Sequence, residues 1–213
     1  MPTALLDTSI YPSTVTHDAT ATRRVAQRGN RLVMWIEEAP VRRRLRGKTQ
    51  EESDAIYRSL DQMAEMARDG ALVPYDSDET IFESLYLHLP ALRGSQFDVF
   101  RGVKRRIAQG PLRRTYMIEG CFSEEQARFS KEQHNRDREQ FLENINHPRF
   151  LKMKKRTGGS HLADLYLVWT AEENSLDYFI TLDTTFLNAV TLPKPLDTAV
   201  KLCTPMQFVQ QCS

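Results

Sequence analysis

The sequence predicts an open α/β fold. Two short apolar runs, at residues 4–6 and 178–180, indicate buried strands, and each is soon followed by an aspartate among hydroxyl residues. A strand that begins almost at the first residue and leads straight into a polar cluster is placed like the central strand of an α/β sheet. The 213 residues are enough for one domain with a real core and insertions.

Composition excludes several classes of protein. Hydrophobic content of 40% and charged content of 27% are ordinary for a globular protein, and the net charge of +1 gives no global attraction to nucleic acid. The three cysteines lack metal-ligand spacing, which favours reduced thiols and a cytoplasmic location. The first residues lack the pattern of a signal peptide, and no apolar run is longer than that at residues 165–169, which is too short to cross a bilayer.

The first third of the chain predicts a mixture of elements. Residues 18–27 favour a helix that stops at Gly29 and Asn30. Residues 31–38 are ambiguous between strand and helix, and they contain one apolar block at residues 32–36. Residues 51–69 predict a helix, because apolar side chains recur at helical spacing until a glycine ends the pattern.

The next segments predict a strand and then a helix. Residues 71–75 indicate a strand. Pro74 indicates either that this strand is near a sheet edge or that the proline is near the end of the strand. The acidic and hydroxyl residues at 76–79 predict a helix start, and Glu83 in its second turn faces either solvent or a site. A strand is a weaker expectation at residues 116–118.

The second half is dominated by predicted helices. Residues 123–144 indicate a charged, largely exposed helix, and Ser160 is expected to cap a helix that runs to residue 174. A short helix follows residue 183. A last strand at residues 199–203 then leads to a terminal helix opened by Thr204 and Pro205.

Four acids stand at corresponding places along this pattern. Asp7 and Asp183 follow apolar strands, and Glu83 and Asp164 lie near the starts of helices. Each also has a plain structural interpretation, as a turn or cap residue, a solvent-facing residue, or a carboxylate that favours the helix dipole. A carboxylate at the carboxyl end of a strand in an open α/β sheet points to the place where such folds bind ligands.

These acids and their neighbours resemble the PIN domain, a family of metal-dependent nucleases that includes the VapC-type ribonuclease toxins of bacteria. The matching motifs are Leu6-Asp7-Thr8-Ser9, Ser77 six positions before Glu83, Asp164 nineteen positions before Asp183, Thr181-x-Asp183-x-x-Phe186, and residues 200–209. The sequence differs from compact members in two long insertions, at roughly residues 12–50 and 90–158 of what we expect to be a single PIN-like nuclease domain.

The resemblance implies a three-layer α/β/α fold with a central, mostly parallel sheet and a metal-dependent endoribonuclease activity. Asp7, Glu83, Asp164 and Asp183 are then the expected catalytic residues and ligands of Mg²⁺ or Mn²⁺, which prefer oxygen ligands. Ser9 and Thr181 are expected to support the site by holding a water there. The histidines show no ligand spacing, so zinc is disfavoured and we interpret them as surface or loop residues: His17, His88, His134, His147 and His161.

RNA is the substrate that the resemblance implies, and a basic groove suits a single-stranded RNA loop, because its backbone is accessible and its unstacked bases can be read. Candidate phosphate contacts lie in three basic runs that are otherwise explained as solvated faces: Arg42, Arg43, Arg44, Arg46, Lys104, Arg105, Arg106, Lys154 and Lys155. A structure-specific DNA nuclease and a catalytically inactive module that binds nucleic acid or protein are the alternatives. A role as toxin, defence effector or RNA-processing enzyme, an antitoxin-like partner and a homodimer all stay open, and no membrane partner is expected.

Overall fold

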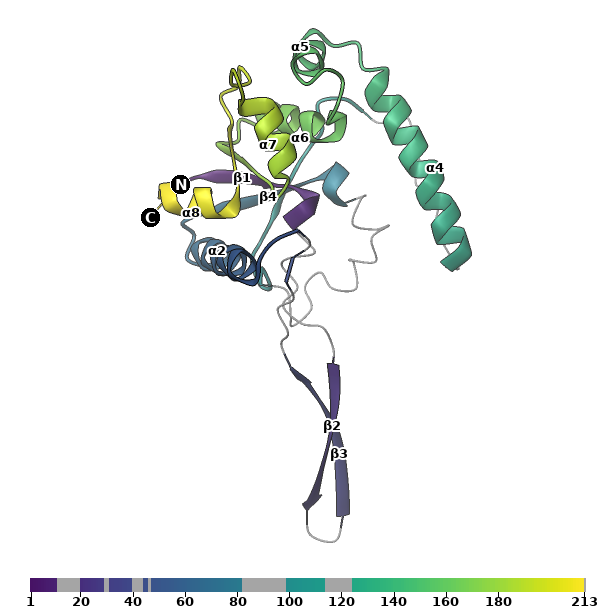
Figure 1. The fold of residues 1–213 in the computed structure, drawn as a ribbon, viewed down its shortest axis with the longest axis vertical. Helices are drawn as coiled ribbons and strands as arrows, with labels where there is room; N and C mark the ends of the chain where they lie inside the picture. Colours follow the sequence, from purple (N-terminus) through teal and green to yellow (C-terminus); the bar gives the residue numbers. More distant parts are fainter. Residues whose placement is uncertain are drawn as a thin grey trace.

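The computed structural model describes residues 1–10, 20–28, 31–39, 44–45, 47–81, 99–113 and 124–212. A five-stranded, all-parallel sheet in the order β5-β4-β1-β6-β7 forms its centre, which confirms the predicted α/β class (Figure 1). The strands of this sheet are β1 (Thr3–Leu6), β4 (Val73–Ser77), β5 (Arg106–Ala108), β6 (Tyr178–Ile180) and β7 (Lys201–Cys203). The helices are α2 (Gln50–Arg68), α4 (Glu124–Glu143), α5 (Pro148–Arg156), α6 (Leu162–Glu173), α7 (Thr184–Thr191) and α8 (Pro205–Cys212), with a short 3₁₀ helix η1 (Thr8–Ile10) after β1.

Strand β1 is the central strand of the sheet. It pairs with β4 on one side and with β6 on the other, so that Leu5 lies opposite both Tyr75 and Phe179. Along the chain, β4 and β5 extend the sheet in one direction, and β6 and β7 extend it in the other. The strand order therefore reverses between β1 and β6, which is where open α/β sheets characteristically bind ligands.

Both faces of the sheet are covered by helices. Leu5 and Phe179 are fully buried in a cluster with residues of α5, α6 and α7, whereas Ala4, Leu6 and Ile180 are fully buried in a second cluster with α2 and α8. Figure 1 shows α2 and α8 on one side of the sheet and α6 and α7 on the other. Burial on both faces explains why these strands are continuous apolar runs instead of alternating ones.

Most of the predicted helices are confirmed, together with the last strand. Helix α2 begins with a capping box between Thr49 and Glu52, and Gly70 beyond its end has a φ of 73°. Helix α8 begins at Pro205, and the Thr204 hydroxyl accepts a hydrogen bond from the Gln207 amide. Among the helices described, none is long and apolar enough to cross a membrane.

The helix predicted at residues 18–27 is wrong. The chain forms strand β2 (Thr20–Arg28), which pairs antiparallel with β3 (Arg31–Ala39) in a separate two-stranded sheet. The ambiguous block at residues 31–38 is therefore a strand. Strand β3 contains Val33, Trp35 and Ile36, which are residues of high β propensity, and a Gly-Asn pair between two runs is also a hairpin signal.

The structure decides between the two alternatives for Pro74 and corrects the predicted cap of α6. Pro74 is not on a sheet edge, because β4 lies between β1 and β5; it is near a strand end, and pairing with β5 starts only at Tyr75. Ser160 does not cap α6. The residue at the cap position is His161, and the Ser160 hydroxyl instead donates to the carbonyl of Thr157.

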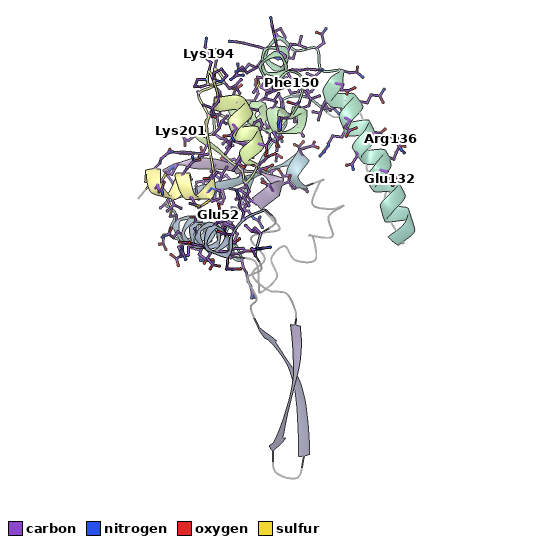
Figure 2. All side chains as sticks on the ribbon, viewed as in Figure 1. Glu52, Glu132, Arg136, Phe150, Lys194 and Lys201 are labelled. Carbon is purple, nitrogen blue, oxygen red and sulfur yellow. The ribbon has the colours of Figure 1, made fainter. Side chains whose placement is uncertain are left out.

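Two elements have no counterpart in the sequence analysis. Strand β5 lies within the segment interpreted as an insertion, yet it forms one edge of the central sheet. Helix α5 follows the predicted helix α4, whose Glu132 and Arg136 are exposed, while Phe150 of α5 is fully buried against α6 (Figure 2). The strand predicted at residues 116–118 lies outside the described residues.

Candidate metal centre

The ends of β1 and β6 meet at the point where the strand order reverses. The Asp7 amide donates to the carbonyl of Ile180 at 3.0 Å, which extends the pairing of the two strands by one residue. The Thr181 hydroxyl then donates to Oδ2 of Asp7 at 2.7 Å. Residues 174 positions apart in the chain are thus joined directly at the carboxyl edge of the sheet.

The Asp7 carboxylate is buried and held by several donors. Its Oδ1 accepts from the Thr8 amide at 2.7 Å, and its Oδ2 accepts from the amide and hydroxyl of Ser9 as well as from Thr181. The Ser9 hydroxyl also accepts a bond from the Leu182 amide at 3.0 Å. Ser9 and Thr181 therefore fix the orientation of this carboxylate through charge-assisted hydrogen bonds, and their expected role in holding a water stays a prediction.

Asp183 is both a helix cap and a member of the cluster. Its Oδ1 accepts from the amides of Thr185 at 2.8 Å and Phe186 at 2.9 Å, so Asp183 is the N-cap of α7. Its own amide donates to the Thr181 hydroxyl at 2.9 Å. Because the cap uses only Oδ1, the capping role leaves the second oxygen available to the space in front of α6.

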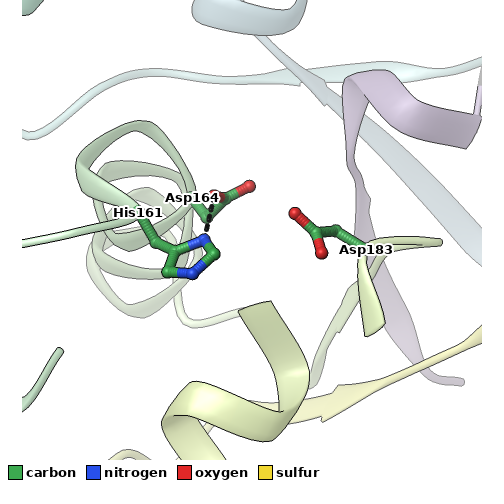
Figure 3. Close-up of side chains that lie close together, drawn as sticks. All are labelled: His161, Asp164 and Asp183. Carbon is green, nitrogen blue, oxygen red and sulfur yellow. Dashed lines mark ion pairs between the residues drawn. The ribbon is translucent and has the colours of Figure 1, made fainter. Parts of the chain in front are cut away.

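Asp164 and His161 face Asp183 from the start of α6. Asp164 lies in the first turn of this helix, and its Oδ2 is 3.5 Å from Nδ1 of His161. One ligand atom from each of His161, Asp164 and Asp183 lies within 4.8 Å of the other two. Figure 3 shows the carboxylate of Asp183 pointing toward the other two side chains.

The three aspartates share one electrostatic environment. Burial raises the pKa of Asp164 from an ordinary value of 3.8 to about 7, and the charges of Asp7 and then Asp183 add to this rise. Arg138 of α4 acts in the opposite direction on the pKa of Asp164. Mutual repulsion among partly buried carboxylates is what a bound cation relieves, so this donor set of carboxylate oxygens fits a hard divalent ion.

Three of the four predicted acids are therefore brought together. Asp7, Asp164 and Asp183 lie at the same edge of the sheet, although Asp7 does not belong to the closest group of ligand atoms found among the described residues. Glu83 lies outside the described residues, so its predicted place in the cluster is not described. The plain interpretation of Asp183 as a cap is also correct, and capping is compatible with a place in the site.

Sequence analysis missed three residues near these acids. Glu79, just after β4, is 2% exposed and lies 3.6 Å from Arg138, and Arg138 in turn acts on Asp164. Glu79 belongs to the segment interpreted as a helix start. Arg138 belongs to the helix that was expected to be charged and largely exposed. His161 was interpreted as a surface or loop residue, and no spacing signal linked it to Asp183.

The predicted phosphate contacts have varied surroundings. Lys104, Lys155 and Arg44 are exposed, while the guanidinium of Arg105 is 3.8 Å from Asp76. Two further side chains of this set make structural contacts: Arg106 donates to the Tyr75 hydroxyl, and Lys154 donates to the Glu143 carbonyl. Arg42, Arg43 and Arg46 lie outside the described residues.

Comparisons with protein-family models, with curated proteins and with solved structures gave no significant match to this chain. The α/β class and the parallel sheet of this chain agree with the fold that the PIN resemblance implies.

Proposed function

We propose that this chain is a metal-dependent endoribonuclease related to the PIN domain, with Asp7, Asp164 and Asp183 as its catalytic centre. The observation that carries the proposal is the meeting of Asp7 and Asp183 at the reversal point of a parallel sheet, with Asp164 facing them. These acids lie directly after β1, in the first turn of α6 and directly before α7, so only the folded chain brings them together.

The order of the acids supports the relation to PIN domains. An aspartate follows the first strand, another lies in the first turn of a helix, and a third follows the next strand within the Thr-x-Asp-x-x-Phe motif. Each part of that motif has a structural role, since Thr181 bonds to Asp7, Asp183 caps α7, and Phe186 is fully buried beneath it. The resemblance is thus carried by residues that build the site.

Each residue has a distinct role in the proposed reaction. Asp164 and Asp183 would hold a Mg²⁺ or Mn²⁺ ion directly, and the buried Asp7 would complete the negative field around it. Such an ion, when bound, screens the phosphate, activates water and stabilises the leaving oxygen. Ser9 and Thr181 hold the carboxylate of Asp7 in place through hydrogen bonds to its Oδ2. Asp164 must lose its proton before it can bind the ion, since burial and the nearby charges raise its pKa to about 7.

The direct test is a cleavage assay with acid-to-amide variants. The wild type is expected to cut single-stranded RNA or tRNA only in Mg²⁺ or Mn²⁺, and Asp7→Asn and Asp164→Asn are expected to abolish cleavage with unchanged circular dichroism. Asp197→Asn is the matched control. Asp197 precedes β7, its side chain is 80% exposed, and it forms an ion pair with Lys152. Flapped DNA as a parallel substrate separates an RNA nuclease from a DNA nuclease. Equal cleavage by wild type and both site variants would overturn the proposal.

A further inference from the structure

We propose that His161 is a ligand in the same centre, which makes it a mixed imidazole–carboxylate site that prefers a first-row transition ion such as Mn²⁺ to Mg²⁺. The inference rests on the metal centre of the proposed function and adds to it the identity of the ion. It is carried by the position of one imidazole relative to two carboxylates from separate elements.

The backbone turns His161 toward the acids. His161 precedes α6 with φ 58° and ψ 36°, the left-handed conformation that non-glycine residues adopt at an energetic cost. Its side chain makes no capping hydrogen bond to the helix that it precedes. The imidazole is directed instead to Asp164, three residues along the chain.

The imidazole is also supported from the other side of the site. Its ring lies 5.6 Å from the ring of Phe186, centroid to centroid, and Phe186 is fully buried. Phe186 belongs to α7, the helix that Asp183 caps, and its amide donates to the Asp183 carboxylate. One helix therefore holds both the imidazole and the carboxylate opposite it.

The distances suit ligands of a common ion. Two donor atoms each about 2.1 Å from one cation are roughly 3 Å apart when they subtend a right angle and roughly 4.2 Å apart when they are opposite. The 3.5 Å between Nδ1 of His161 and Oδ2 of Asp164 falls in this range. The limit of 4.8 Å, within which the ligand atoms of all three residues lie, is slightly above the range. By contrast, 3.5 Å is long for a direct N–H···O hydrogen bond.

The proposed ligand changes which ion the site selects. Mg²⁺ prefers oxygen ligands and retains several waters, whereas imidazole favours transition ions over Mg²⁺. Three aspartates alone are compatible with either ion, so the preference depends on His161. The site should therefore bind Mn²⁺ more tightly than Mg²⁺.

The test uses Mn²⁺ alone as a probe of the full chain, without substrate. Pulsed electron paramagnetic resonance of the wild-type Mn²⁺ complex is expected to show coupling to an imidazole nitrogen, and His161→Gln is expected to lose it. Titration calorimetry should show Mn²⁺ affinity reduced roughly 10-fold or more in His161→Gln, with little change for Mg²⁺. His147→Gln is the matched control: His147 is stacked on Trp169, with the ring centroids 4.6 Å apart, and should leave both readouts unchanged.

The failures of the two proposals are distinguishable. If Mn²⁺ binds the wild type and Asp183→Asn abolishes binding, but no nitrogen coupling is seen, His161 is not a ligand and the proposed metal centre stands. The same conclusion follows if coupling persists in a folded His161→Gln variant. If the folded wild type binds no Mn²⁺ at all, both the inference and the metal centre are overturned.

Discussion

Asp183 combines a structural and a proposed chemical role within one side chain. Its Oδ1 accepts hydrogen bonds from the amides of Thr185 and Phe186 in the first turn of α7, while its carboxylate lies within 4.8 Å of ligand atoms of His161 and Asp164. An amide side chain can replace the carboxylate in the first role, since asparagine is as good an N-cap as aspartate. It is a poor substitute in the second, because it carries no charge to attract a cation.

Two substitutions therefore separate the roles of Asp183. Asp183→Asn is expected to keep the stability of the apoprotein and to lose at least roughly 100-fold in cleavage rate. Asp183→Ala should lose the same activity and also about 1 kcal/mol of unfolding free energy, because α7 then lacks its cap. Urea denaturation and a cleavage assay on the three proteins check both parts. Full activity in Asp183→Asn would show that the carboxylate is needed only as a cap.

The raised pKa of Asp164 predicts how stability depends on pH. In the unfolded chain this group loses its proton near its ordinary pKa of 3.8, whereas in the folded apoprotein it keeps the proton up to a pKa of about 7. Between these values the folded state binds more protons, so the unfolding free energy should fall as pH rises and level off above pH 7. From pH 5 to pH 8 the loss from this group should be of the order of 2–3 kcal/mol.

Urea denaturation with EDTA at pH 5 and pH 8 measures this loss, and Asp164→Asn is the reference that lacks the titrating group. The wild type should lose more stability than the variant over this interval. Saturating Mn²⁺ at pH 8 should then stabilise the wild type alone, because binding to the folded state adds to its stability. Identical pH profiles for the two proteins would contradict the clustering of charge at Asp164.

At the scale of elements, one hydroxyl links the carboxyl ends of two neighbouring strands. Thr181 is fully buried, donates to Asp7 at the end of β1 and accepts from the amide of Asp183. The pairing of β1 with β6 brings the two strand ends together, and Thr181 sets the relative positions of the two carboxylates beyond them. The relative position of the Asp7 and Asp183 carboxylates therefore depends on the pairing of β1 with β6 and on Thr181.

Thr181→Val keeps the shape of the side chain and removes the hydroxyl. It is expected to lower the unfolding free energy by about 1–3 kcal/mol, because the buried carboxylate of Asp7 and the half-buried amide of Asp183 each lose a partner, and to lower the cleavage rate roughly 10- to 100-fold. Thr170→Val is the control: Thr170 is equally buried, but its hydroxyl donates to the Tyr166 carbonyl within α6 and, in the part of the chain that the structure describes, makes no hydrogen bond to Asp7 or Asp183. Equal effects of the two substitutions would mean that Thr181 has no special role.

Helix α4 is connected to the site through Arg138. The Arg138–Glu79 pair is 3.6 Å apart, with side chains 18% and 3% exposed, and is therefore expected to couple more strongly than a surface pair. A double-mutant cycle with Arg138→Gln and Glu79→Gln should give a coupling of about 1–3 kcal/mol in urea denaturation. The Lys152–Asp197 pair is closer, at 2.6 Å, but its side chains are 62% and 80% exposed, so its coupling should stay below about 1 kcal/mol. Comparable values for the two pairs would show that Arg138 contributes only as a surface charge.

The parts that could be predicted from the sequence are those in which local pattern and fold agree. Strands β1 and β6, which precede Asp7 and Asp183, are continuous apolar runs because both faces of the sheet are buried. The polar residues after these strands mark the edge of the sheet. Strand β5 has only one buried residue, Ala108, so it lacks any such signal. The environments of His161 and Arg138 depend on how α6 and α4 pack, and no local pattern carries that information.

At the scale of the whole molecule, the topology places the acids. The centre lies between β1 and β6, where the chain stops extending the sheet on one side and begins to extend it on the other. Helices α6 and α7 cover the same face of the sheet and bring Asp164 opposite Asp183 (Figures 1 and 3). The net charge of +1 means that attraction of RNA must come from local basic residues around this edge, not from the molecule as a whole.

The most direct test of the shared cation site is anomalous diffraction from crystals of the wild-type protein saturated with Mn²⁺ above pH 7. An anomalous peak is predicted about 2.1–2.3 Å from a carboxylate oxygen of both Asp164 and Asp183. Ordered carboxylates with no peak between them, or a Mn²⁺ ion bound only at another part of the surface, would contradict a cation site shared by these acids.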